Sequence, residues 1–330
     1  MKNKKKIIIT VVSVVLILAL IGTGIYFYLM RYSKDKNDTE ELYRQNVEAV
    51  GYENTIETAY PQTELYKVID EHFRSVLPEG KNEKKAIILG FDGCRADVLT
   101  EVKNENSAIG YLLKNGASKN LLYCGGVNYP LENTQATSTA PGWCSVLTGV
   151  WADEHGIYSN DVTKQMNTKT IMTTLTEDAV IDSASFITRW KGHFSRNNAT
   201  YLLEKDYCAE NNLGVTFNHC KNNDASHEFV LGEVKKEDCP DFLFVIYEHT
   251  DSTGHSYGFT HNNPVYREAF VESDECAYET IKAIEARENY DTEDWLIIIT
   301  SDHGGIGTDH GGASVQERMT FVVMNKEIAE

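Results

Sequence analysis

Long apolar runs that end in acidic residues are the clearest pattern along this chain. The run KAIILGFDG, residues 85–93, stops at an aspartate and a glycine, and the pattern recurs at residues 242–251 and 295–305. Shorter runs at residues 184–190 and 320–325 have the composition of further strands. Uninterrupted apolar strands are typical of a sheet that is buried on both faces.

Helix-length segments separate these runs, such as REAFVESDECAYETIKAIEARE at residues 267–288. Strands that alternate with helices predict an α/β fold with a central, mostly parallel sheet and helices on both of its faces. Ligand sites in such sheets lie beyond the carboxyl ends of the strands. We therefore expect the chemistry of this chain to lie where the apolar runs stop.

The N-terminus has a different pattern from the rest of the chain. MKNKKK carries four lysines, and residues 7–30 form a run without any charge. That run is long enough to cross a bilayer, which needs about 20 residues. A signal peptide is the alternative, but its apolar region is shorter and ends at a small-residue cleavage site, which is not evident here. We expect an uncleaved anchor in the cell membrane, with the N-terminus cytoplasmic and the rest of the chain extracellular.

These patterns divide the chain into four parts. Residues 1–6 form a cytoplasmic tail, and residues 7–30 form the transmembrane anchor. Residues 31–83 are polar and irregular with helical patches, which predicts a juxtamembrane spacer and the first packed helices. Residues 84–330 form the domain that carries the chemistry.

Charge and cysteine content narrow the function. The formal net charge is −18, which argues against binding a nucleic-acid duplex because such a binder needs a basic surface. The seven cysteines include no C-x-x-C pair, so a structural zinc finger is not supported. An odd number outside the cell leaves at least one cysteine either as a free thiol or in an intermolecular disulfide. Cys208 and Cys220 are close enough in sequence to pair, but the sequence leaves the pairing open.

Potential metal ligands follow three of the predicted strands. Aspartate oxygens and imidazole nitrogens suit zinc or manganese. A single aspartate at a strand end is more often a turn or cap residue, but three such ends together favour a shared cation, since crowded carboxylates repel one another. The candidates are Asp92 after the first run, Asp251 and His255 after the second, and Asp302, His303 and His310 after the third.

Spacing supports part of this set. Asp251 and His255 are four residues apart, so one helical turn would bring both to the same ion. His249 and His261 flank this pair and are the alternative ligands. The remaining histidines are expected in packing or surface positions: His72, His155, His193, His219 and His227.

The segment TSTAPGWCSVLTG, residues 137–149, holds several hydroxyl groups before a predicted helix. Composition alone does not identify a nucleophile, because loops rich in serine and threonine are common. The decisive feature is the order of four motifs along the chain. These are GFDGCRADVL, TSTAPGWCSVLTGVWADEHGIYSN, EHTDSTGHSYG and SDHGG. Together they resemble the alkaline phosphatase superfamily, and most closely its nucleotide pyrophosphatase/phosphodiesterase branch, over about residues 84–325.

The resemblance implies a role for each motif residue. Thr139 corresponds to the nucleophile at the start of a helix, and Asn160 corresponds to an amide that holds a phosphoryl oxygen. Two divalent ions are implied, with zinc as the expected metal and manganese as the alternative. Thr137, Ser138 and Thr148 are interpreted as structural. By analogy, one ion is held by Asp92, Thr139, Asp302 and His303, and the other by Asp251, His255 and His310.

The implied activity is hydrolysis of a small phosphodiester or pyrophosphate substrate through a phospho-threonine intermediate. A sulfatase is disfavoured, because Thr139 and Trp143 stand where its formylglycine precursor and arginine would be. Three alternatives stay open, namely a phosphomonoesterase, a phospho-head-group transferase and a non-catalytic metal-binding surface protein. Four aromatic residues could stack a nucleotide base, although such residues are more often part of the core: Trp143, Trp151, Tyr158 and Tyr257.

Overall fold

The structure is a computed structural model. It describes residues 37–102, 105–125, 135–161, 164–195, 197 and 199–326. The predicted transmembrane run at residues 7–30 lies outside these ranges. Within them, none of the helices is both long and apolar enough to span a bilayer.

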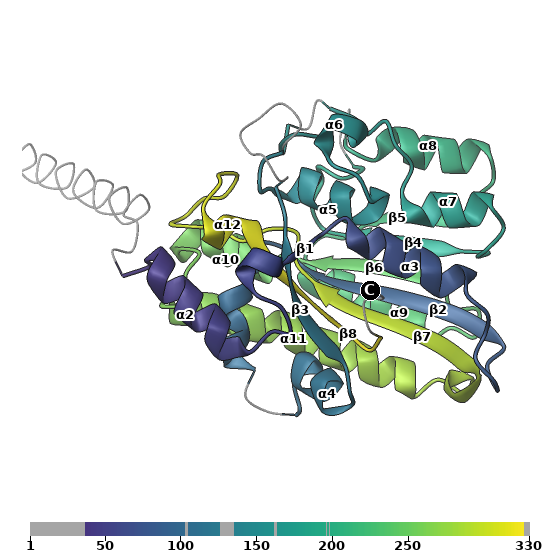
Figure 1. The fold of residues 1–330 in the computed structure, drawn as a ribbon. Helices are drawn as coiled ribbons and strands as arrows, with labels where there is room; N and C mark the ends of the chain where they lie inside the picture. Colours follow the sequence, from purple (N-terminus) through teal and green to yellow (C-terminus); the bar gives the residue numbers. More distant parts are fainter. Residues whose placement is uncertain are drawn as a thin grey trace, which may run out of the picture.

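A single eight-stranded sheet forms the centre of the domain (Figure 1), with the strand order β1-β3-β8-β7-β2-β6-β4-β5. Most neighbouring strands are parallel, and β8 is antiparallel to both β3 and β7. The prediction of an α/β fold with a mostly parallel sheet is confirmed. The strands are β1 (Tyr60–Pro61), β2 (Glu83–Phe91), β3 (Ser118–Tyr123), β4 (Ala184–Thr188), β5 (Val215–His219), β6 (Phe242–Tyr247), β7 (Glu293–Thr300) and β8 (Met319–Met324).

Five of these strands match the apolar runs of the sequence, and three do not. The three unpredicted strands are β1, β3 and β5. β1 has only two residues, β3 begins with the polar residues SKN, and β5 lies at the edge of the sheet with a half-exposed pattern. Edge and short strands lack the continuous apolar character of the buried central strands.

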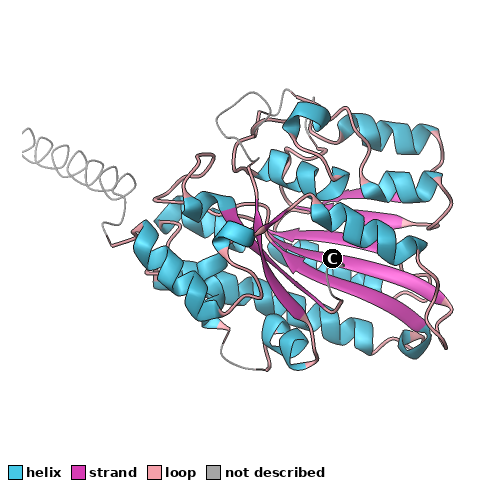
Figure 2. Ribbon diagram, in the orientation of Figure 1, coloured by secondary structure: helices cyan, strands magenta, loops and turns pink. Residues whose placement is uncertain are grey.

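Helices cover both faces of the sheet (Figure 2), and alternate residues of the strands point to the two layers. Ile88 of β2 packs into one core, whereas Ile87 and Leu89 pack into the other. The first core includes side chains from α3 (Glu64–Arg74), α5 (Thr139–Thr148), α7 (Ile171–Glu177) and α8 (Leu202–Glu210). The second includes side chains from α4 (Ala108–Lys114), α9 (Asn223–Val234) and α11 (Pro264–Glu285).

The strand order brings the predicted metal ligands together. β7, β2 and β6 are neighbours and run parallel at the middle of the sheet, so their carboxyl ends meet at one edge. α10 (His249–Tyr257) begins directly after β6 at this edge, and α12 (Val315–Arg318) precedes β8. We call this the catalytic edge, defined by the residues that follow β7, β2 and β6.

The N-terminal helix α2 (Glu40–Val50) is fastened to the domain through a buried arginine. The Arg95 guanidinium donates to both carboxylate oxygens of Asp38 at 2.8 and 2.9 Å and also to Asp97. It lies 5.0 Å from the centre of the Tyr43 ring and donates to the carbonyl of Phe259 at 2.6 Å. The start of the described chain is therefore linked to a loop beside the catalytic edge.

All seven cysteines are free thiols, and six of them are buried. Cys208 Sγ lies 3.4 Å from Thr173 Oγ1 and is not bonded to Cys220, so the pairing left open by the sequence is not formed. Burial raises the pKa of Cys144 and Cys208 above the ordinary value, which disfavours the thiolate. These residues act as small apolar side chains in the core.

Replacing Asp38 by asparagine should destabilise the domain. The Arg95 side chain is fully buried, and that of Asp38 is 6% exposed. The change therefore leaves a buried cation with one carboxylate fewer. We expect the free energy of unfolding to fall by about 2–3 kcal/mol. Urea denaturation followed by circular dichroism measures this loss. The control is Glu57→Gln, which removes the exposed pair with Arg44 and should change stability little. Equal losses of stability in the two variants would contradict a stabilising role for the buried Arg95–Asp38 ion pair.

Candidate metal centre and nucleophile

The first group of potential ligands lies at the ends of β2 and β7. Asp92 directly follows β2, and Asp302 and His303 follow β7 after one serine. His303 Nε2 lies 3.5 Å from Asp92 Oδ1 and 3.4 Å from Asp302 Oδ2. All three side chains are at most 1% exposed, and each offers a ligand atom within 4.8 Å of the others. The group is small enough to surround one ion.

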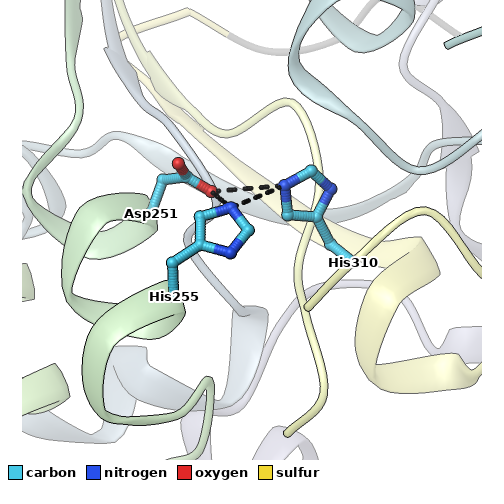
Figure 3. A group of neighbouring side chains, drawn as sticks. All are labelled: Asp251, His255 and His310. Atoms are coloured by element: carbon cyan, nitrogen blue, oxygen red, sulfur yellow. Dashed lines mark hydrogen bonds and ion pairs between the residues drawn. The ribbon is translucent and has the colours of Figure 1, made fainter. Parts of the chain in front are cut away.

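The second group lies on α10 and on the loop before α12 (Figure 3). Asp251 and His255 are one turn apart on α10, and the loop brings His310 to them. Asp251 Oδ1 lies 3.5 Å from Nε2 of each histidine, and the two Nε2 atoms lie 3.1 Å apart. The His255 side chain is 41% exposed. Unlike the first group, this one opens to solvent.

The two groups are neighbours. The ring centres of His303 and His310 lie 4.1 Å apart, which places one ring of each group against the other. The six side chains therefore form one continuous site at the catalytic edge.

All three histidine rings are oriented in the same way. Nδ1 of His303, His255 and His310 lies 2.7, 3.0 and 3.0 Å from a backbone carbonyl oxygen. A carbonyl only accepts, so Nδ1 carries the proton in each contact, and in the neutral ring Nε2 keeps its lone pair. Such a bond at the far nitrogen is the usual way in which proteins orient metal-binding histidines. The Nε2 atoms of His255 and His310 face each other, and their lone pairs repel unless a proton or a cation lies between them.

The crowded carboxylates repel one another, so positive charge would stabilise the site. Burial, together with the charge of Asp92, raises the pKa of Asp251 to about 6 and raises the pKa of Asp302 well above its ordinary value. Burial opposes protonation of His303, but Asp302 and Asp92 outweigh it and raise the pKa of this histidine to about 10. Burial and the neighbouring His303 lower the pKa of His310 to about 2.

These residues fit a pair of divalent cations. Asp251 Oδ1 and Asp302 Oδ2 are buried and accept no hydrogen bond from the described residues. Oxygen and imidazole donors in sets of three suit zinc, which takes three protein ligands at a catalytic site and keeps a further position open. A divalent cation in each group would offset the carboxylate repulsion and bind the two oxygens that accept no hydrogen bond.

Thr139 is the hydroxyl that contacts the first group, whereas Ser138 Oγ lies 3.3 Å from His310 Nδ1 of the second. Thr139 is the first residue of α5, and its Oγ1 lies 3.4 Å from Asp92 Oδ1 and 3.5 Å from His303 Nε2. Asn160 Oδ1 accepts from the backbone N–H of Ala140 at 2.8 Å, and this bond holds Asn160 Nδ2 at 3.5 Å from Thr139 Oγ1. The hydroxyl, the amide and the start of the helix thus face the same space.

Two glycines allow the close approach of the elements that carry these groups. Gly93 follows Asp92 with φ +64°, and a Cβ there would lie 2.9 Å from the Asp251 side chain. Its N–H donates to Asp302 Oδ1 at 3.1 Å. A Cβ at Gly142 of α5 would lie 2.8 Å from the Asp302 carbonyl oxygen. Any other residue at these positions would push the ligand segments apart.

Sequence reasoning missed the residues that hold this site in place. Thr137 was expected to be structural, with a hydrogen bond to its loop or as a helix cap, but its three contacts with the distant segment that carries His310 were not foreseen. Its carbonyl accepts from His310 Nδ1 at 3.0 Å, and its Oγ1 accepts from Gly311 N at 3.0 Å and donates to the Gly312 carbonyl at 3.1 Å. Glu317 Oε1 also accepts from Gly312 N at 2.7 Å. No local sequence pattern predicts these contacts, since Thr137 and His310 are far apart in the chain.

The aromatic candidates divide between core and surface. Trp143 is fully buried, and its Nε1 donates to Asp92 Oδ2 at 3.2 Å, so it supports a ligand and does not face a substrate. Trp151 stacks on Tyr123. Tyr158 and Tyr257 are 44% and 68% exposed.

The alternative ligand histidines point elsewhere. His249 Nδ1 contacts Ser273 Oγ at 3.1 Å, and His261 Nε2 contacts Thr100 Oγ1 at 2.8 Å. Neither belongs to the two groups of potential ligands found among the described residues. His155 is buried and helps to fix the turn before Asn160, with its Nδ1 accepting from Ile157 N at 3.1 Å.

Comparison with solved structures finds similar chains with low sequence identity. An inactive variant of murine ectonucleotide pyrophosphatase/phosphodiesterase 5, in complex with AMP, is 18% identical over 68% of this chain and 57% of its own, with a TM-score of 0.48. The C-terminal periplasmic domain of EptC from Escherichia coli, in complex with zinc, is 14% identical over 76% of each chain, with a TM-score of 0.46. The corresponding domain of phosphoethanolamine transferase EptC from Campylobacter jejuni is 10% identical over 74% of this chain and 79% of its own, with a TM-score of 0.47. The present chain thus spans just over half the length of the murine protein.

A family comparison covers most of the domain. Residues 86–318 match the family described as type I phosphodiesterase/nucleotide pyrophosphatase. This range contains all four motifs on which the resemblance to the alkaline phosphatase superfamily was based, and that resemblance is confirmed. The chain belongs to the type I phosphodiesterase/nucleotide pyrophosphatase family.

Proposed function

We propose that this chain is a metal-dependent phosphodiesterase that acts through a phospho-threonine intermediate at Thr139. One observation carries the proposal. Thr139 Oγ1, the only hydroxyl of the 137–149 segment in contact with the first ligand group among the described residues, lies within 3.5 Å of two of its members. A nucleophile beside a buried set of metal ligands is the arrangement that phosphoryl transfer requires.

Two ions would be held by the residues of the two groups. Asp92, Asp302 and His303, with Thr139, would hold the ion beside the nucleophile, and Asp251, His255 and His310 would hold the other. Zinc suits these donors. When bound, such ions lower the pKa of a hydroxyl and neutralise charge on the phosphoryl oxygens.

The protein groups define the course of the reaction. Thr139 Oγ1 forms the new bond to phosphorus, and the hydroxyl proton faces Asp92 Oδ1. Asn160 Nδ2 is placed to donate to a phosphoryl oxygen, and the N–H groups at the start of α5 favour the same negative charge. The bond to the leaving oxygen breaks in line with the attack, and the leaving group departs as an alkoxide that takes a proton from water. A second water then attacks the phosphorus of the phospho-threonine and the bond to Oγ1 breaks. One proton of that water returns to Oγ1, and a phosphate monoester is released.

We also propose that residues 7–30 anchor the enzyme in the cell membrane with the domain outside. The support is the uncharged run and the four preceding lysines of the sequence. This proposal is independent of the catalytic one.

The proposed activity favours diesters over monoesters. A diester carries one negative charge fewer, and the amide of Asn160 is neutral, so the site does not supply an extra cation at this position for a monoester dianion. We expect the full chain with zinc to hydrolyse bis(p-nitrophenyl) phosphate faster than p-nitrophenyl phosphate. Release of p-nitrophenolate measures both rates. Faster cleavage of the monoester would overturn the diesterase assignment, and no cleavage of either would favour a non-catalytic protein.

Thr139→Ala should abolish diester hydrolysis while the domain stays folded. The change removes the attacking oxygen, so we expect kcat to fall by at least about 1,000-fold. The matched control is Ser138→Ala, which removes the neighbouring hydroxyl and its 3.3 Å contact with His310 Nδ1. It should retain most of the activity, because His310 Nδ1 keeps its bond to the Thr137 carbonyl. Circular dichroism verifies the fold of both variants. If Ser138→Ala is inactive and Thr139→Ala is active, the nucleophile has been assigned to the wrong hydroxyl.

Zinc should stabilise the folded protein. Ligands that bind only the native state add stability in proportion to the logarithm of their concentration, and a cation here relieves carboxylate repulsion. We expect the melting temperature of the chelator-treated chain to rise on adding zinc, with about two equivalents bound. Asp251→Asn should reduce the bound zinc to about one equivalent. Differential scanning calorimetry and elemental analysis measure the two effects. An unchanged melting temperature with no zinc bound would contradict the proposed sites.

A further inference from the structure

Arg189 is a cation beside the catalytic edge that the proposed chemistry does not use. It directly follows β4, the strand that pairs in parallel with β6, so it lies beside the point where β6 passes into α10. Its Nη2 lies 3.0 Å from Glu248 Oε2 and also contacts Ser252 Oγ. Ser252 follows Asp251 in the sequence. The guanidinium therefore packs against the same turn of α10 that carries the second ligand group.

Much of the hydrogen-bonding capacity of Arg189 is unused. A guanidinium has five N–H donors, and both protein contacts of Arg189 are made by Nη2. Nε is buried and has no partner among the described residues, and the side chain as a whole is 31% exposed. Glu248, its ion-pair partner, is 7% exposed. The arginine is thus held in place by a buried carboxylate while part of its planar group remains available.

The position of Arg189 relative to Thr139 indicates which part of a substrate it meets. In an in-line displacement the leaving oxygen lies opposite the attacking oxygen. Thr139 contacts the buried group of Asp92 and His303, whereas Arg189 packs beside Asp251 of the more exposed group. Asn160 and the start of α5 lie at the nucleophile. If Thr139 attacks from the first group, a leaving group that extends toward the second group would meet Arg189.

We infer that Arg189 is a specificity-determining residue that binds a second anionic group on the leaving side of the substrate. This rests on the proposed function. A phosphate joined to the reacting phosphorus is the group that a guanidinium recognises best, because two N–H donors match two phosphate oxygens. Among the phosphodiester and pyrophosphate substrates that the resemblance implies, Arg189 would then favour the pyrophosphate-linked diesters, from which a phosphate monoester departs in place of an alkoxide.

Two substrates with the same transferred group test this inference. Bis(p-nitrophenyl) phosphate and P1,P2-bis(p-nitrophenyl) pyrophosphate both leave p-nitrophenyl phosphate on Thr139, and only the second has a phosphate in its leaving group. For Arg189→Gln in the full chain with zinc, we expect kcat/KM for the pyrophosphate to fall at least tenfold more than kcat/KM for the simple diester. Inhibition by inorganic pyrophosphate should weaken in parallel, and inhibition by inorganic phosphate should weaken less.

Three further variants separate specificity from general charge and folding effects. Lys191→Gln removes an exposed cation from the same loop and should leave the ratio of the two kcat/KM values unchanged. Arg189→Lys keeps the positive charge but lacks the planar guanidinium, so it should recover part of the wild-type kcat/KM ratio. The double variant Glu248→Gln/Arg189→Gln removes both members of the ion pair, which limits the loss of stability. In this variant the kcat/KM ratio of the pyrophosphate to the simple diester should stay below the wild-type ratio.

The outcomes distinguish the two proposals. If the wild type cleaves neither compound, the proposed function fails. If the wild type cleaves both and Arg189→Gln lowers both rates by the same factor, or if the double variant restores the wild-type ratio, Arg189 only balances the charge of Glu248 and the inference is overturned.

Discussion

Repulsion among buried carboxylates is the constraint on which the rest of this structure depends. Asp92, Asp251 and Asp302 lie at the ends of three adjacent strands, and burial together with Asp92 raises the pKa of the other two. Such an arrangement is costly to fold unless positive charge is supplied. His303, whose pKa the carboxylates of Asp302 and Asp92 raise to about 10, supplies part of this positive charge. Two divalent cations would satisfy the remainder, and the same charge would activate a hydroxyl placed beside them.

The fold provides this site through strand order and through contacts distant in sequence. β7, β2 and β6 are neighbours only because the chain crosses over between them, so the three acids meet although they are far apart along the chain. The loop before Thr139 is held against the segment that carries His310 through Thr137, and helix α2 is held beside the same edge through Arg95. The helix α2 lies outside the range matched by the family, yet it shields this buried arginine. The described N-terminal helix is therefore part of the catalytic domain's structure.

The sequence predicted the elements whose signal is local. Central strands are continuous apolar runs, and the helix that carries Asp251 and His255 follows from their spacing, so both were found. The short strand β1, the partly polar β3 and the edge strand β5 carry no such run, and they were missed. The candidate ligands could be proposed because each follows a strand, and the structure brings the six together. The contacts of Thr137, Trp143 and Arg189 depend on how distant segments pack, and no spacing rule reveals them.

The location of bound zinc in crystals of the protein tests the account most directly. Anomalous diffraction at the zinc edge measures it without reference to activity. The account predicts two peaks. One should lie about 2 Å from ligand atoms of Asp92, Asp302 and His303 and in contact with Thr139 Oγ1, and the other at the same distance from Asp251, His255 and His310. Zinc bound away from these residues, or a fully loaded crystal with no peak beside Thr139, would contradict it.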